Sequence, residues 1–258
     1  MRRQRGEEHS RIDPAWESCY RRSLAHGEER MATNKPIFTR ETFRFFRELA
    51  RHNRKEWMDA NRERYQEHVV APFRRLLQEL SQSVLSLDMN FDTSGRTGAN
   101  FSRINRDIRF AKDKTPYRAQ MYLKFPAVFS GGEAGQLYVG LSADSVTAGF
   151  RIYSGGARKT SALALLAEPR LNGNPRWLAQ QKKRLSRAYE SYWYSAEKNE
   201  WTKHEGWPVA ADEWKKVQGW IVRKKLTPAG AARAAFPGEV TKVFRELFPL
   251  VRFTSLRE

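Results

Sequence analysis

Residues 103–125 read RINRDIRFAKDKTPYRAQMYLKF, a charged stretch that leads directly into an alternating apolar one. In the second part, Met121, Leu123 and Phe125 recur at every second position. A period of two is typical of a strand that buries one face. This stretch therefore predicts a half-buried strand over residues 119–129, preceded by a polar loop.

The charged part, residues 103–118, does not have the pattern of a helix. Pro116 has no amide hydrogen and biases Thr115 toward an extended backbone, so a regular helix cannot run through the middle. Functional side chains commonly collect in loops that a rigid scaffold holds. We expect this loop to lie between two strands and to be held by the sheet.

The strand pattern continues after the first strand. Leu137, Val139 and Leu141 again recur at every second position, and residues 146–153 form a further strand-like run. Short connections between successive strands favour an antiparallel meander. Residues 220–226 are predicted as one more short strand.

Helical spacing dominates both ends of the folded region. Three helical segments are predicted over residues 39–87, with Pro72 starting or kinking the third. Further helices are predicted at about 157–168 and 175–190, and a last helix is predicted to stop at Pro249. This order indicates an α+β fold with N-terminal helices, a central mainly antiparallel sheet and C-terminal helices.

Composition limits the class of protein. The chain has 258 residues and eight tryptophans, which favours a folded protein with a sizeable core. Its single cysteine, Cys19, excludes a disulfide within the chain, and no apolar run approaches the ~20 residues of a membrane helix. We expect a cytoplasmic protein, with residues 1–36 as a disordered tail or gene-model extension and residues 37–258 as a single α+β domain.

The charge of the chain points to an anionic partner. A net charge of +18 favours nucleic acid or phosphate-bearing molecules, and the 103–118 loop concentrates cations. Arginine forks bind phosphate or carboxylate bidentately, and lysine adds a movable point charge. The predicted anion ligands are Arg103, Arg106, Arg109, Lys112, Lys114 and Tyr117, and the predicted orienting residues are Asp107, Asp113, Asn61 and Arg62. Tyr65 is expected to face the same site, because it shares a helical face with Asn61.

Three alternatives stay open on these residues. The loop could be a structural ion-pair network without a ligand. The chain could bind nucleic acid without sequence preference, through the helix at residues 176–187, residues 223–225 and exposed tryptophans. An enzyme of phosphoryl chemistry would use Asp107 or Asp113 through a metal ion. The sequence assigns no catalytic residue, metal, cofactor or oligomeric state.

The loop also carries a family resemblance. The motif RIxRDIRFAKDKTPY at residues 103–117 resembles the signature of the domain-of-unknown-function 2461 family. The helical region upstream is similar to that family's opening pattern at Asn53, Trp57, Asn61, Arg62, Tyr65 and Pro72. The resemblance extends from about residue 37 to the C-terminus. It implies an α+β fold and an intracellular protein, and it implies no established activity.

Overall fold

The computed structural model describes residues 35–127, 135–154, 163–197 and 200–255. The predicted tail therefore lies almost wholly outside the described residues, and so does the first half of the helix predicted at 157–168. Residues Lys35–Glu258 form one compact unit. No helix in the described parts of the chain has the length and apolar character needed to cross a membrane.

Helices come first, as predicted. They are α2 (Arg40–Arg51), α3 (Lys55–Ala60), α4 (Arg62–Tyr65), a π-helical turn (Gln66–Val70) and α5 (Ala71–Leu85). Thr39 is the N-cap of α2, and its N–H donates to Thr42 Oγ1 at 3.3 Å. Phe38 before this cap and Phe43 within the helix are both buried, as a hydrophobic staple requires. Pro72 is the second residue of α5, which continues directly from the π-helical turn.

The sheet has six strands, all paired antiparallel. They are β1 (Gln120–Pro126), β2 (Gln136–Ser142), β3 (Val146–Tyr153), β4 (Glu190–Glu197), β5 (Glu200–Glu205) and β6 (Val217–Leu226). Their order in the sheet is β1-β2-β3-β6-β4-β5. The first three strands form the predicted meander. The last strand in sequence is inserted between β3 and β4, and the β4–β5 hairpin was not predicted.

The remaining helices are α6 (Leu163–Gly173), α7 (Trp177–Leu185), α8 (Pro228–Ala231) and α9 (Phe236–Phe253). The prediction that the last helix stops at Pro249 is wrong, because α9 continues through that proline to Phe253. The extra turn is held by packing: Phe253 stacks on Trp177 with ring centroids 4.7 Å apart and meets Trp214 edge-on at 5.6 Å.

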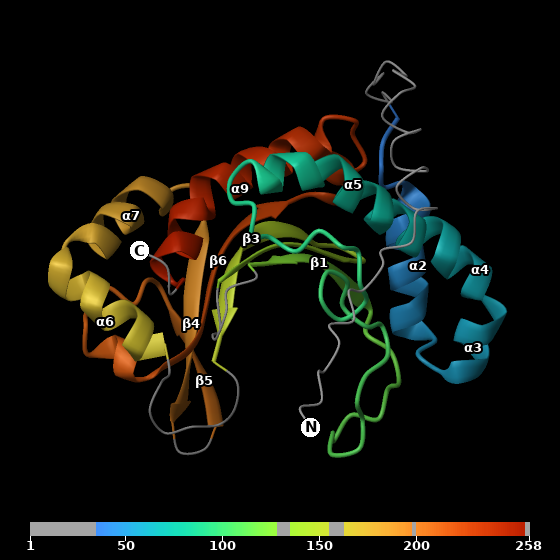
Figure 1. Cartoon of the computed structure of the whole chain (residues 1–258). Coiled ribbons are helices and arrows are strands. Elements are labelled where there is room, and N and C mark those ends of the chain that lie inside the picture. The colour runs from blue at the N-terminus through green and yellow to red at the C-terminus, as the bar shows by residue number, and fades with distance from the viewer. Residues whose placement is uncertain (1–34, 128–134, 155–162, 198–199, 256–258) are drawn as a thin grey trace, which may run out of the picture. The chain divides into compact units, whose positions relative to one another are not determined.

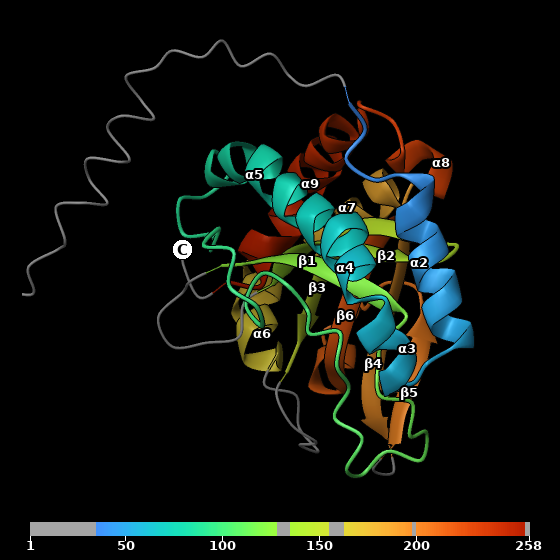
Figure 2. The ribbon, with the colours of Figure 1, turned by 90° about the vertical axis from the view of Figure 1, so that its right-hand side faces the viewer.

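The helices and the sheet form two layers. Helices α5 and α9 lie along one face of the sheet, and the main core fills the space between them (Figure 1). Phe125 of β1 meets Phe244 of α9 edge-on at 5.6 Å within that core. The loop of residues 103–118 and the β4–β5 hairpin extend away from these helices, beyond the opposite side of the sheet (Figure 1, Figure 2).

Candidate functional site

The loop of residues 103–118 is anchored at its base by main-chain pairing. Asn105 and Tyr117 form an isolated antiparallel bridge, and the two flanking backbone hydrogen bonds are each 2.8 Å long. Just before the loop, Phe101 pairs with Leu123 of β1 as a single bridge and not as a full strand. The loop therefore leaves and rejoins the fold beside β1, which is an edge strand of the sheet.

Asn53 ties the end of this loop to the N-terminal helices. The Tyr117 N–H donates to Asn53 Oδ1 at 3.0 Å, and Asn53 Nδ2 donates to the Tyr117 carbonyl at 2.9 Å. The Tyr117 ring is buried in the main core. Tyr117 is thus a packed residue at the base of the loop, and its role as an anion ligand stays a prediction.

Several cations of the loop are paired with its own carboxylates. Arg109 forms a bidentate pair with Asp107, with Nε to Oδ1 at 3.0 Å and Nη2 to Oδ2 at 2.7 Å. Arg106 donates through Nη1 to Asp113 Oδ2 and to Thr115 Oγ1. These contacts hold the loop in one shape and occupy donors that an anion ligand would need.

The same contacts shift the acidity of both carboxyl groups. The Asp113 carboxylate accepts from the Thr115 amide and from Arg106, which lowers the pKa of Asp113 to about 2. Hydrogen bonds from the Arg109 side chain and amide lower the pKa of Asp107. Both aspartates are therefore ionised at neutral pH, and both act as acceptors for the loop's own donors.

The other loop cations differ in their contacts. Lys114 Nζ donates to the Ile108 carbonyl at 3.0 Å. Arg103 and Lys112 are exposed and contact no acceptor among the residues that the structure describes. Arg103 is therefore a predicted anion ligand that keeps all its donors available.

Two predicted orienting residues belong to the junction between α3 and α4. Asn61 Nδ2 donates to the Trp57 carbonyl at 2.9 Å, and Arg64 donates to Asn61 Oδ1 at 2.7 Å. Arg62 pairs with Asp59 at 2.9 Å. These bonds connect successive helical turns, so Asn61 has a local structural role.

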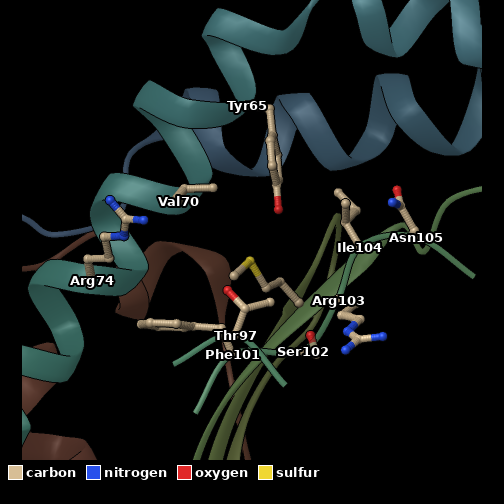
Figure 3. A pocket seen from close by; sticks show the side chains of 10 residues that line it. Tyr65, Val70, Arg74, Thr97, Phe101, Ser102, Arg103, Ile104 and Asn105 are labelled. Carbon is tan, nitrogen blue, oxygen red and sulfur yellow. The ribbon is translucent and has the colours of Figure 1, made fainter. Parts of the chain in front are cut away.

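A cavity of about 310 Å³ lies between the N-terminal helices and the start of the loop (Figure 3). Arg74 of α5 and Arg103 of the loop lie on opposite sides of it, and the Tyr65 hydroxyl points toward the space between them. Within the described chain, none of these three side chains has a hydrogen-bond or ion-pair partner. Burial raises the pKa of the Tyr65 phenol, and the charge of Arg62 lowers it to a smaller extent. The phenol is therefore protonated at neutral pH and can donate.

The π-helical turn Gln66–Val70 shapes one wall of this cavity. Tyr65 immediately precedes the turn, Val70 is its last residue, and both line the cavity. A single π turn inside a helix is uncommon and is frequent at functional sites. The turn places Tyr65 and Arg74 toward the same space.

The sequence pattern indicates part of the cavity lining. It grouped Tyr65 with the loop, and the structure brings Tyr65 and Arg103 to one cavity. It does not indicate Arg74, because one arginine on an amphipathic helix cannot be told apart from the other exposed charged residues of that helix. The only available signal was its position four residues after Val70, on the same helical face.

The described residues contain no cluster of three or more histidine, cysteine, aspartate or glutamate side chains suited to a metal ion. The fold and the cavity define the class: an α+β protein with helices on one face of a six-stranded antiparallel sheet and a basic cavity beside its edge strand. Within that class, the chain belongs to the family described as "Conserved hypothetical protein (DUF2461)", whose model matches residues 41–253. This confirms the resemblance seen in the loop motif. No curated protein matched the chain.

Proposed function

We propose that the protein binds a small anionic ligand, bearing a phosphate or carboxylate group, in the cavity between Arg74 and Arg103. The observation that carries this proposal is the placement of two unpaired guanidinium groups, from different segments, on opposite sides of one cavity. The Tyr65 hydroxyl adds a neutral donor between them. A volume of about 310 Å³ suits a small ligand.

The electrostatics of the cavity favour an anion. Two arginines line this one cavity, and its lining includes no carboxylate, so an anion that enters it would be attracted by both positive charges. Guanidinium groups present parallel N–H donors that match the oxygens of phosphate or carboxylate, which makes such pairs stronger than neutral hydrogen bonds. In this proposal Arg74 and Arg103 are the anion ligands, and Tyr65 fixes the orientation of the bound group.

The rest of the loop has a supporting role in this proposal. Arg106 and Asp113 hold the loop shape that places Arg103 at the cavity. Arg109, Lys112 and Lys114 contribute long-range positive potential, which speeds the encounter with an anion. The ion-pair alternative is thus favoured for the loop tip, where the pairs are observed, and anion binding is favoured for the cavity.

Calorimetric titration of the full-length protein with inorganic phosphate and pyrophosphate tests the proposal. Replacing Arg74 or Arg103 with glutamine should weaken binding about tenfold or more, because each removes a charge-assisted hydrogen bond worth about 1.5–3 kcal/mol. Arg118→Gln is the matched control: Arg118 is an exposed arginine at the end of the same loop that does not line the cavity.

Two results would overturn the assignment. Wild-type protein that binds neither anion at millimolar concentration has no such site. An Arg118→Gln variant that loses as much affinity as Arg103→Gln would show that net charge, and not the cavity, attracts the anion.

A further inference from the structure

The face of the sheet opposite α5 and α9, here called the open face, has its own aromatic cluster. Its members are buried against each other and not against the main core: Tyr138, Tyr192 and Ile221, with Tyr122 and Tyr194 packed around them. The strand register places these residues on one side, because cross-strand partners point to the same face. The open face therefore carries a packed aromatic cluster of its own, whereas the solvent side of a sheet commonly carries separate polar side chains.

Glycines on neighbouring strands let the tyrosine rings lie against the sheet. A Cβ atom on Gly140 would lie 2.5 Å from the Tyr122 ring, and one on Gly219 would lie 2.5 Å from the Tyr153 ring. Each ring therefore occupies the space that a side chain would fill on the adjacent strand. The Tyr153 ring, which is 41% exposed, presents its other face outward.

An aromatic row crosses the open face from β3 to β5. Tyr153 pairs with Tyr194 at a ring-centroid distance of 6.4 Å, and Tyr194 pairs with Trp201 at 6.2 Å. Tyr153 is 41% exposed and Trp201 is 46% exposed, which is unusual for large aromatic side chains. Tyr194, between them, is half-buried. By contrast, Trp207, Trp214 and Trp220 are buried in the main core, which excludes them from the exposed tryptophans expected from the sequence.

Cations lie over the rings of the neighbouring tyrosine cluster, which is made of Tyr122, Tyr138 and Tyr192. The Arg151 guanidinium lies over Tyr122 and over Tyr138, 5.6 Å from each ring centroid. Arg223 and Lys203 both lie over Tyr192, at 5.0 and 4.6 Å.

Cations outnumber carboxylates on the open face. The cations are Lys124, Arg151, Lys203, Arg223 and Lys225, and the carboxylates are Glu190 and Glu205. Glu190 pairs with Arg223 and Lys225, and Glu205 pairs with Lys203. Arg151 Nε is buried and has no hydrogen-bond partner in the structure described. The face thus carries an excess of positive charge.

We propose that the open face binds single-stranded nucleic acid. Bases would stack on Tyr153, Tyr194 and Trp201, because every base has an aromatic face that such side chains can contact. Arg151, Arg223 and Lys203 would neutralise the phosphates. A duplex keeps its base faces inside the helix, so a flat aromatic row selects the single strand. An apolar protein partner fits less well, because positive charge is spread over the rings.

This surface is independent of the anion cavity. None of its aromatic or cationic residues named here lines the space between Arg74 and Arg103. The two proposals can therefore fail separately, and phosphate affinity at the cavity should not change when the open face is altered.

Fluorescence anisotropy with the full-length protein tests the proposal, using a labelled thymidine oligonucleotide of about 12 nucleotides and the same strand annealed to its complement. Trp201→Ala and Tyr153→Ala should each weaken single-strand binding at least fivefold, because base stacking on one aromatic side chain contributes about 1–3 kcal/mol. Phe110→Ala is the matched control, since Phe110 is 95% exposed but lies on the loop tip and not in the row. Tyr153→Phe should restore the affinity that Tyr153→Ala loses.

The aromatic variants leave the net charge unchanged, so they separate stacking from general attraction. Arg151→Gln should also reduce the slope of log affinity against log salt by about one phosphate contact. The proposal is overturned if Trp201→Ala and Tyr153→Ala, with unchanged melting temperatures, bind as the wild type does. It is equally overturned if the duplex binds as tightly as the single strand, or if neither binds at micromolar protein.

Discussion

Asp113 is the residue through which pH should act on the 103–118 loop. Its Oδ1 accepts from the Thr115 amide at 2.9 Å, and its Oδ2 accepts from Thr115 Oγ1 at 2.9 Å and from Arg106. These bonds favour the ionised form and lower the pKa of Asp113 from 3.8 to about 2. A carboxyl whose folded pKa is depressed stabilises the fold above its unfolded pKa.

We therefore expect the loop to keep its conformation at pH 4 and to lose the Asp113 contacts as the pH falls through the folded pKa, with half of them lost at about pH 2. Nuclear magnetic resonance titration of the Asp113 carboxyl carbon and the Thr115 amide measures this directly. In Asp113→Asn the Thr115 amide should no longer titrate in that window. An Asp113 carboxyl that titrates near 3.8 would contradict the hydrogen-bonding pattern.

Gly149 is the glycine whose replacement should cost most among those on the sheet. A Cβ there would lie 2.4 Å from the Val222 carbonyl oxygen and 2.9 Å from the Arg223 Cα, so β3 and β6 would have to separate. Gly149→Ala should destabilise the protein by about 3 kcal/mol, as overpacking does where backbone must move. Gly238→Ala is the control, because a Cβ atom at this position in helix α9 would meet nothing within 4 Å.

Urea denaturation of both variants measures the difference in the free energy of unfolding. Gly238→Ala should be neutral or stabilising by up to about 1 kcal/mol, since alanine is the better helix former. Equal stabilities of the two variants would mean that β3 and β6 tolerate a side chain between them.

At the scale of elements, strands were predicted where apolar residues recur at every second position, as in β1 and β2. Strand β1 shows the strict alternation of buried and half-buried residues that its sequence predicted. Strand β4 was missed because Tyr192 and Trp193 are adjacent and both buried, one on the open face and one in the main core. A strand covered on both faces loses its period of two, so its aromatic residues alone do not indicate a strand.

Pro249 shows tertiary packing overriding a local rule. A proline within a helix cannot donate to the carbonyl four residues earlier, that of Arg245, and its ring crowds that carbonyl. The helix nevertheless continues, because Leu250, Val251 and Phe253 are buried beyond it. Sequence patterns could not show this, since the partner aromatic residues Trp177 and Trp214 are distant in the chain.

Pro249→Ala should therefore stabilise helix α9. The substitution restores a hydrogen bond and removes a clash, which together stabilise the helix by about 3 kcal/mol. Alanine also leaves the unfolded chain more conformational freedom than proline does, which lowers the free energy of unfolding by about 0.4–1 kcal/mol. We expect a net gain of about 2 kcal/mol in the free energy of unfolding. Chemical denaturation measures it, and a destabilised variant would mean that the proline ring itself contributes packing that alanine cannot replace.

At the scale of the whole molecule, the sequence predicts a candidate site in the 103–118 loop but does not indicate which residues of the fold lie beside it. The 103–118 motif stood out because its cations and carboxylates are consecutive in the chain. Which of those cations is available to a ligand depends on how the chain folds. Arg106 pairs with an aspartate seven residues away, whereas Arg103 lines the same cavity as Arg74. The sequence indicates the open face even less, because its row joins Tyr153 to Trp201 across four neighbouring strands, β3, β6, β4 and β5.

The compact unit should not need the first 34 residues. It begins at Lys35, and the buried core of the described chain begins at Ile37. Arg75 Nη2 donates to the Lys35 carbonyl at 2.9 Å. Phe38 is fully buried and meets Phe73 edge-on at 5.2 Å. The N-terminal boundary of the stable fold is therefore expected between residues 35 and 38.

Two truncations test this boundary. A protein that starts at residue 35 should melt within a degree or two of the full chain, because it keeps every contact of the described core. A protein that starts at residue 39 lacks Phe38 and should lose about 3 kcal/mol or more, the cost of removing a buried phenylalanine side chain. For a domain of this size that loss corresponds to roughly 6–12 °C in melting temperature. A large drop already at residue 35 would show that the N-terminal segment contributes to the folded unit, and identical melting of both truncations would mean that Phe38 is not a core residue.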